Sequence, residues 1–221
     1  MRLQNIRTIV WDLDGTLIDS FELFQEILTD ALKGFDLILP SRETMLHNFH
    51  GSLEETIANV LDIEGDVLMA VIDAFLEVQA PHYKQVEHLV HGDASSLAKR
   101  AHARGIGQII VTNREHEGRG EASPISITKR SSFKDYIKTV VSGDNSPYRK
   151  PDARALEKLT MESGILVIGD QFVDAEFARN LGGQAILVNR HTEDIAHLER
   201  LGADWQSFVT VVKSLDEVDF S

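Results

Sequence analysis

The stretch that decides the fold of this chain is IVWDLDGT, residues 9–16. Its first three residues are a short apolar run of the kind that forms a buried parallel strand. Asp12 and Asp14 follow directly, and residues two apart at the end of a strand point to the same side. Gly15 then allows a sharp exit from the strand. The stretch predicts two carboxylates at the carboxyl edge of a parallel sheet, where open α/β folds bind ligands. A solvated acidic turn is the alternative interpretation.

Four further short runs rich in β-branched residues follow along the chain, bounded by Gly, Asp or Asn. They are Ile109–Val111, Thr139–Val141, Leu166–Ile168 and Ala185–Val188. Helical patterns over residues 93–104, 152–163 and 172–181 lie between most of them. Strands that alternate with helices predict a Rossmann-like α/β fold, an open parallel sheet with helices on both faces.

A long segment without a strand-like run separates the first strand from the second. Asp19 with Glu22, and Ser52 with Glu55, have the spacing of capping boxes that open helices. A longer helical pattern follows them, and Pro81 is expected to end it. These signals predict a small all-helical domain inserted after the first strand.

The resulting domain prediction is a helical insertion at residues 17–90 and an α/β core made of residues 1–16 and 91–221. The formal net charge of −13 disfavours binding to nucleic acid or to anionic membranes. The chain has no cysteine, which excludes disulfides and thiolate metal sites. It shows neither a signal peptide nor an apolar run near the ~20 residues that cross a bilayer. We therefore expect a cytoplasmic protein, either a monomer or a homodimer.

A second pair of acids, Asp170 and Asp174, follows the fourth apolar run. Taken alone, they fit a strand-to-helix turn with an acid near the helix N-terminus equally well. Together with Asp12 and Asp14 they would supply hard oxygen ligands from separate strand ends. Such ligands suit Mg²⁺, which binds few protein carboxylates and keeps waters and substrate oxygens.

Two weaker signals lie after the second and third apolar runs. Lys150 precedes Pro151, and pointing inward it would offer a positive charge to a phosphate and to a carboxylate, although a lysine there is usually a surface residue. Thr112 and Asn113 offer a hydroxyl and backbone N–H groups that could hold phosphate oxygens, although both residue types are common at strand ends.

The four signals in this order resemble the haloacid dehalogenase superfamily of phosphohydrolases, in particular its phosphoglycolate-phosphatase-like branch. The motifs that carry the resemblance are DLDGTL at 12–17, VTN at 111–113, Lys150-Pro151 and Gly169-Asp170-x-x-x-Asp174. The helical insertion is similar to the small α-helical cap of that superfamily. The resemblance implies a Mg²⁺-dependent phosphoric monoester hydrolase acting on a small phosphorylated metabolite, with the cap closing over the site.

The resemblance also implies a role for each site residue. Asp12 attacks phosphorus and becomes an aspartyl phosphate. Asp14 protonates the leaving oxygen, then activates water, and lends a backbone carbonyl to Mg²⁺. Thr112 and Lys150 hold the phosphoryl group. Asp170 ligates Mg²⁺, and Asp174 ligates or supports it.

The summed formal charge of the site residues agrees with these roles. The four aspartates and Lys150 sum to a formal −3, which Mg²⁺ would bring to −1, so the ion decides whether a phosphate dianion can bind. Crowded carboxylates raise one another's pKa, and Asp14 is the natural one to hold a proton as general acid. Asp12, beside the ion and Lys150, would stay ionised, as a nucleophile must.

Three features leave alternatives open. The stretch Glu115–Gly120 forms helix poorly, so Arg114 or Arg119 could contact substrate, although a surface loop is the stronger expectation. His50 in the insertion could read the leaving group or be a surface residue. A sugar phosphomutase would keep both aspartates, and a phosphate- or metabolite-binding module without turnover is a rival of another class. A dehalogenase would not need Asp14, so the presence of Asp14 argues against that reaction.

Overall fold

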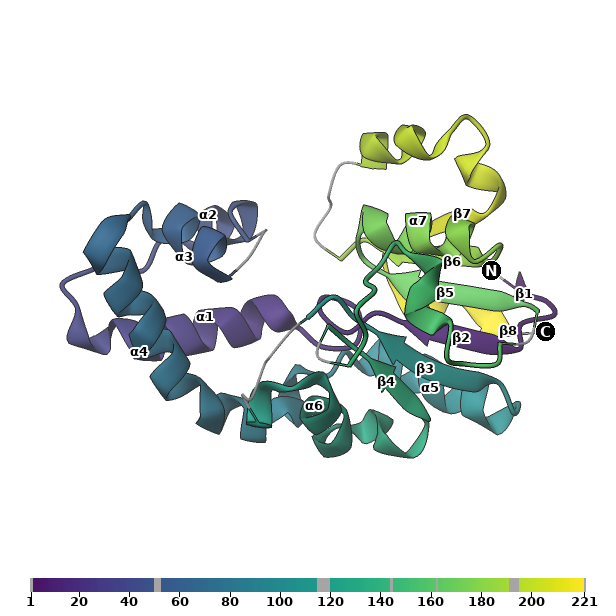
Figure 1. The fold of residues 1–221 in the computed structure, drawn as a ribbon, viewed down its shortest axis with the longest axis horizontal. Helices are drawn as coiled ribbons and strands as arrows, with labels where there is room; N and C mark the ends of the chain where they lie inside the picture. The colour runs from purple at the N-terminus through teal and green to yellow at the C-terminus, as the bar shows by residue number, and fades with distance from the viewer. Residues whose placement is uncertain are drawn as a thin grey trace. The chain divides into compact units, whose positions relative to one another are not determined.

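The computed structural model describes residues 2–49, 53–114, 120–143, 145–161, 163–190 and 195–220. They form two compact units (Figure 1). The first contains the sheet and consists of Met1–Asp19 and Val90–Ser221, and the second is the helical segment Ser20–Leu89. Two features of the sequence analysis, His50 and the capping residue Ser52, lie outside the described residues.

The sheet of the first unit has six parallel strands in the order β4-β3-β2-β5-β6-β7. Each of the five apolar runs lies in one of these strands, and the Rossmann-like α/β class is confirmed. The sequence analysis missed β7, whose two middle residues are only half-buried, so its apolar run lacks the signature of a central strand. The strands are β2 (Thr8–Trp11), β3 (Gly107–Val111), β4 (Thr139–Val141), β5 (Ile165–Gly169), β6 (Gln184–Val188) and β7 (Val209–Val212).

Helices cover both faces of this sheet. Helix α5 (Gly92–Ala103) packs near β3, and α7 (Phe172–Asn180) packs on β5 and β6 from the other side (Figure 1). From β2 the chain moves toward β4, whereas from β5 it moves toward β7. Because crossovers between parallel strands are right-handed, these opposite directions place the helices on opposite faces. The strand order reverses between β2 and β5, and open α/β sheets bind ligands at such a point.

The predicted helix over residues 152–163 is wrong. A 3₁₀ turn, Ala153–Leu156, forms there instead. The Asp152 side chain caps this turn by accepting from the Arg154 N–H at 2.9 Å. Bonds of the i to i+3 kind continue it, with the Leu159 N–H donating to Leu156 O at 2.9 Å. Local capping and tight turns thus replace the helical pattern that the apolar spacing suggested.

The remaining elements of the first unit are short. Strands β1 (Arg2–Leu3) and β8 (Asp219–Phe220) form a parallel pair that joins the two ends of the chain. Helix α6 (Pro124–Arg130) begins directly after its N-cap Ser123, whose hydroxyl accepts from the Ser126 N–H at 3.2 Å. The other 3₁₀ turns are Gly120–Ala122, Ser132–Asp135, Ile195–Leu201, Trp205–Ser207 and Leu215–Glu217.

The helical unit packs α1 (Ser20–Ala31) against α4 (Gly65–Lys84), with Phe24 and Phe75 ring centroids 5.7 Å apart. Helix α4 continues past Pro81, so the prediction that this proline ends it is wrong. Tyr83 is buried two residues later, and its packing holds the last turn although Pro81 lacks an N–H. The unit also contains α2 (Arg42–His47), α3 (Leu53–Leu61) and the 3₁₀ turns Leu32–Gly34 and Val86–Leu89.

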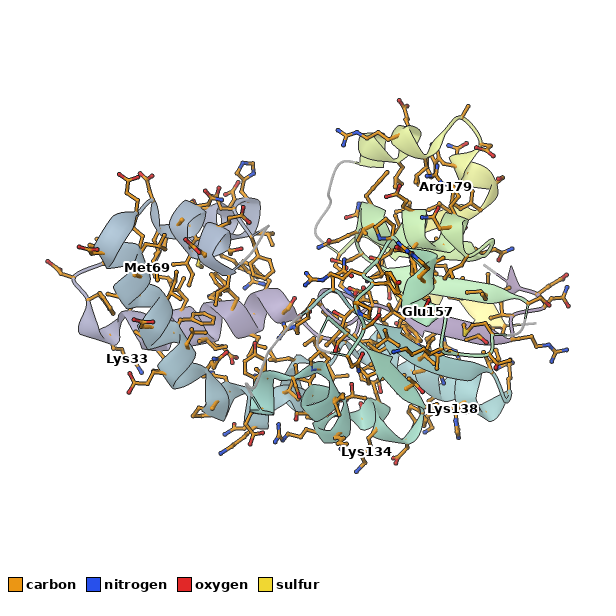
Figure 2. All side chains as sticks on the ribbon, in the orientation of Figure 1. Lys33, Met69, Lys134, Lys138, Glu157 and Arg179 are labelled. Carbon is orange, nitrogen blue, oxygen red and sulfur yellow. The ribbon has the colours of Figure 1, made fainter. Side chains whose placement is uncertain are left out.

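Charged side chains project from both units. Figure 2 shows Lys33 projecting outward from the helical unit, and Lys134 and Lys138 from the first unit. Met69 is half-exposed on α4 and is one of few large apolar side chains on the described surface. None of the described helices combines the length and the apolar sequence that crossing a bilayer requires.

Candidate active site

The loops that follow β2, β3 and β5 meet at the carboxyl edge of the sheet. Asp12 directly follows β2, and its N–H donates to Ile168 O of β5 at 2.8 Å. Thr112 directly follows β3, and its N–H donates to Val141 O of β4 at 3.0 Å. The ladder thus extends one residue beyond the strands at both places. It holds Asp12 at the point where the strand order reverses, and Thr112 at the end of the neighbouring strand β3.

Three of the predicted acids form a tight group at this edge. Asp12, Asp170 and Asp174 each offer a carboxylate oxygen, and these oxygens lie within 4.8 Å of one another. Two glycines make the approach possible. A Cβ on Gly15 would stand 2.3 Å from Asp170 Oδ2, and a Cβ on Gly169 would stand 2.1 Å from Asp174 Oδ2. Gly15 therefore admits an acid of the neighbouring loop, and Gly169 admits Asp174, which follows it in the same segment.

Lys150 points inward and joins two of these acids. Its Nζ donates to Asp12 Oδ1 at 2.5 Å and to Asp174 Oδ1 at 2.6 Å, and its side chain is 3% exposed. Asn113 holds the backbone of Lys150 on both sides: Asn113 Oδ1 accepts from the Lys150 N–H at 2.8 Å, and Asn113 Nδ2 donates to Lys150 O at 3.0 Å. The side chain of Asn113 is thus engaged in positioning Lys150 rather than pointing to a ligand.

Burial and charge shift the titration of the group. Burial raises the pKa of Asp12 to about 7, with Lys150 opposing the shift and the charges of Asp174 and Asp14 adding to it. Burial and the charges of Asp12 and Asp174 raise the pKa of Asp170 well above its usual range. Burial alone would lower the pKa of Lys150, but the same two acids outweigh it and raise that pKa. The acids exceed the cations, so the group favours one more positive charge.

Each acid of the group has a distinct hydrogen-bond environment. Asp170 Oδ1 accepts from the Thr16 hydroxyl at 3.2 Å. Asp174 Oδ2 accepts from the Gln171 N–H at 3.1 Å, while its Oδ1 accepts from Lys150. Both oxygens of Asp174 are therefore engaged, which suits a supporting role. Asp170 has the more open carboxylate for a metal ion.

Arg114 reaches the site, whereas residues 115–119, most of the stretch expected to form a surface loop, lie outside the described residues. Its Nε donates to Asp14 Oδ2 at 2.7 Å, its Nη2 donates to Asp14 Oδ1, and its side chain is 13% exposed. The two residues are 100 positions apart, so only the fold brings them together. The signal available in the sequence was an arginine directly after the Thr112-Asn113 motif. Arg119 lies outside the described residues.

A second ion pair, between Asp93 and Arg190, supports the Asp12–Thr16 loop. The sequence analysis missed this pair. Both carboxylate oxygens of Asp93 accept from Arg190, at 2.8 and 2.9 Å. Asp93 Oδ2 also accepts from the Ser214 hydroxyl at 3.0 Å and from the Leu215 N–H at 2.8 Å. Arg190 in turn donates to Thr16 O at 3.4 Å. This hub joins the start of α5, the end of β6 and the segment before β8.

Asp93→Asn is expected to lower the free energy of unfolding by about 1–3 kcal/mol near neutral pH, because it weakens several charge-assisted hydrogen bonds. Burial would raise the pKa of Asp93, but Arg190 and Leu215 outweigh it and lower that pKa to about 2. The folded-state pKa is depressed, so the stabilisation is present above the unfolded value of about 3.9 and is lost as pH falls toward 2. Urea unfolding of the wild type and of Asp93→Asn should show that the difference between their free energies of unfolding is smaller at pH 3 than at pH 6. An equal difference at both pH values would contradict this linkage.

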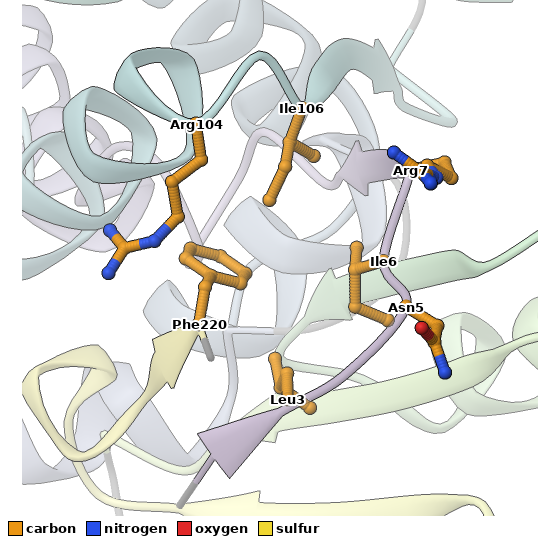
Figure 3. A pocket seen from close by; sticks show the side chains of 7 residues that line it. All are labelled: Leu3, Asn5, Ile6, Arg7, Arg104, Ile106 and Phe220. Carbon is orange, nitrogen blue, oxygen red and sulfur yellow. The ribbon is translucent and has the colours of Figure 1, made fainter.

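A separate hollow of about 400 Å³ lies at the opposite edge of the sheet (Figure 3). Its lining residues, all described, are Leu3, Asn5, Ile6, Arg7, Arg104, Ile106 and Phe220. None of them is an acid or a nucleophile, and Arg104 pairs with Asp219 at 3.7 Å. The chemistry-bearing side chains thus gather at the carboxyl edge and not in this hollow.

Comparisons with known proteins identify the family of this chain. The family model for haloacid dehalogenase-like hydrolases matches residues 9–188. A phosphoglycolate phosphatase from Rhodobacter capsulatus is 24% identical, with 79% of this chain and 80% of the relative covered. The pyrophosphatase PpaX from Bacillus mycoides is also 24% identical, with 90% and 91% covered.

A solved structure supports the fold. The HAD-hydrolase YfnB from Bacillus subtilis, bound to magnesium, superposes with a TM-score of 0.69 at 14% identity, covering 98% of this chain and 97% of its own. The chain belongs to the haloacid dehalogenase-like hydrolase family. Within this family it is a phosphatase, so the predicted class of enzyme is confirmed.

Proposed function

We propose that this protein is a Mg²⁺-dependent phosphatase that hydrolyses a small phosphorylated metabolite through an aspartyl phosphate on Asp12. The observation that carries the proposal is the position of Asp12. It is buried at the strand-order reversal, bonded to Lys150, and grouped with Asp170 and Asp174. Lys150 orients this carboxylate for attack, and a bound cation among the three acids would complete the balance of charge.

In the first step an oxygen of Asp12 forms a bond to phosphorus while the bond from phosphorus to the leaving oxygen breaks. Asp14 gives its proton to that oxygen. In the second step Asp14 takes a proton from water, whose oxygen bonds to phosphorus while the bond to Asp12 breaks. Inorganic phosphate leaves and both acids return to their starting states. Lys150, the Thr112 hydroxyl and the backbone at Asn113 would hold the phosphoryl oxygens.

The donor set fits a magnesium ion. Asp12 and Asp170 would hold it with the backbone carbonyl of Asp14, and Asp174 would ligate it or support it through Lys150. When bound, the ion supplies positive charge that offsets the phosphoryl oxygens and the crowded acids. That the related YfnB structure is bound to magnesium supports this choice of ion.

The relatives suggest the substrates to test first. Their names point to phosphoglycolate and to pyrophosphate, both small phosphorylated molecules. We also propose that residues 17–90 serve as the cap domain, since an all-helical unit, Ser20–Leu89, is inserted between the first two strands of the main sheet. A cap of this kind favours small substrates over proteins or nucleic acids.

Phosphate release tests the proposal. Phosphoglycolate, pyrophosphate, sugar phosphates, nucleotides and a chromogenic ester would each be assayed with Mg²⁺ and with chelator. We expect release that requires Mg²⁺ and returns when the ion is restored. Asp170→Asn should raise the Mg²⁺ concentration for half-maximal rate about 10- to 100-fold, because it removes a charged ligand. Folded protein that binds Mg²⁺ yet releases no phosphate from any ester would point to the mutase or the binding module.

A further inference from the structure

The backbone of Arg114 is fixed at the sheet edge. Its N–H donates to Thr112 Oγ1 at 3.1 Å, and its carbonyl accepts from the Gly143 N–H at 3.3 Å. These bonds tie the residue to the ends of β3 and β4. Arg114 therefore starts from a defined point beside the Asp12 loop, and its side chain is directed rather than free in solvent.

The guanidinium and Asp14 form a two-pronged pair. The nitrogens Nε and Nη2 each donate to a different oxygen of Asp14. The Asp14 side chain is 29% exposed and that of Arg114 13%, so the pair lies at the mouth of the site rather than in the core. Parallel N–H donors of this kind fit any carboxylate or phosphate group of suitable geometry.

The two cations of the site serve different acids. Lys150 bonds Asp12 and Asp174, on the side of the nucleophile. Arg114 bonds Asp14, the residue proposed to face the leaving oxygen. Four acids against these two cations leave a formal charge of −2, which a divalent cation would bring to zero. A substrate with a second negative group thus needs a cation near the leaving group, and among the described residues Arg114 is placed to supply it.

We propose that Arg114 is a specificity-determining residue that selects substrates whose leaving group carries its own carboxylate or phosphate. The inference rests on the proposed function and adds the substrate class. Both oxygens of Asp14 accept from Arg114, so the guanidinium lies beside the leaving oxygen that Asp14 would face, where it can take a further acceptor. An anionic group on the leaving group provides that acceptor in the same two-pronged geometry. A neutral leaving group offers none of equal strength.

Two substrates that differ in one group test this inference. Phosphoglycolate carries a carboxylate on its leaving group, and hydroxyethyl phosphate carries a hydroxymethyl group at the same place. For the full chain with Mg²⁺, kcat/KM would be measured for both. Arg114→Met should lower the value for phosphoglycolate about 10- to 100-fold and change the value for hydroxyethyl phosphate several-fold at most. Pyrophosphate should behave like phosphoglycolate.

Two further variants separate recognition from folding. Arg114→Lys keeps the charge without the two parallel donors. The selectivity ratio, which is kcat/KM for phosphoglycolate divided by kcat/KM for hydroxyethyl phosphate, should therefore lie between the ratios of the wild type and Arg114→Met. Arg104→Met removes an arginine at the opposite sheet edge and should leave the ratio unchanged.

Equal loss for both substrates in Arg114→Met would overturn the inference, because it would mean that Arg114 only positions Asp14. A selectivity ratio near one in the wild type would overturn the inference as well, because the enzyme would then not distinguish the two leaving groups. Failure of the wild-type enzyme to hydrolyse any ester would instead count against the proposed function.

Discussion

Asp12→Asn is expected to lower kcat by at least about 10³-fold for every substrate, because an amide oxygen is a poor nucleophile. The change keeps the size of the side chain and removes one of the crowded acids beside Asp170 and Asp174. Phosphate release under saturating substrate and Mg²⁺ measures the loss.

Thermal unfolding of Asp12→Asn shows whether the variant is folded. Lys150 keeps Asp174 as a partner, and the variant no longer buries a carboxylate whose pKa is raised to about 7. The midpoint of thermal unfolding should therefore match or exceed that of the wild type. Asp73→Asn, at an exposed position of α4, is the matched control and should retain full activity. Substantial turnover by folded Asp12→Asn would remove Asp12 from the mechanism.

Asp14→Asn is expected to lower kcat about 10²- to 10⁴-fold for alkyl phosphates, the range that a general acid and base supplies. The effect on the first step should be much smaller for p-nitrophenyl phosphate, since its leaving group departs without a proton. Stopped-flow release of nitrophenolate separates this step from the hydrolysis of the intermediate. Equal losses in the first step for both kinds of ester would show that Asp14 acts by position and not by proton transfer.

The main acids and Lys150 could be placed from the sequence for a simple physical reason. Each follows a buried β-branched run, and parallel strands bring all their carboxyl ends to one edge. Asp12 and Asp170 were therefore expected at the same edge of the sheet. The pairing of β2 with β5, which makes them neighbours, was not predicted from the sequence. The glycines at 15 and 169 fit this arrangement, because Gly15 leaves room for Asp170 of the adjacent loop and Gly169 leaves room for Asp174.

The pairs formed by long side chains could not be placed in this way. Arg114 reaches Asp14, and Arg190 reaches Asp93, across 100 and 97 positions. No periodicity reports such contacts, since they depend on side-chain direction after folding. The poor helix-forming stretch after Arg114 made the residue resemble part of a surface loop. The segment after Asp152 was missed for another reason, because local capping overrode its apolar spacing.

The central claim is that the phosphoryl group passes to the carboxylate of Asp12. Asp14→Asn, mixed with p-nitrophenyl phosphate and Mg²⁺, tests it most directly, because the variant lacks the group proposed to activate water. After an acid quench, borohydride converts an acyl phosphate of aspartate to homoserine, which mass spectrometry locates in the peptide. We predict a burst of nitrophenolate stoichiometric with enzyme, and homoserine at position 12. A burst with the modification on another residue, or slow turnover with Asp12 unmodified throughout, would contradict the account.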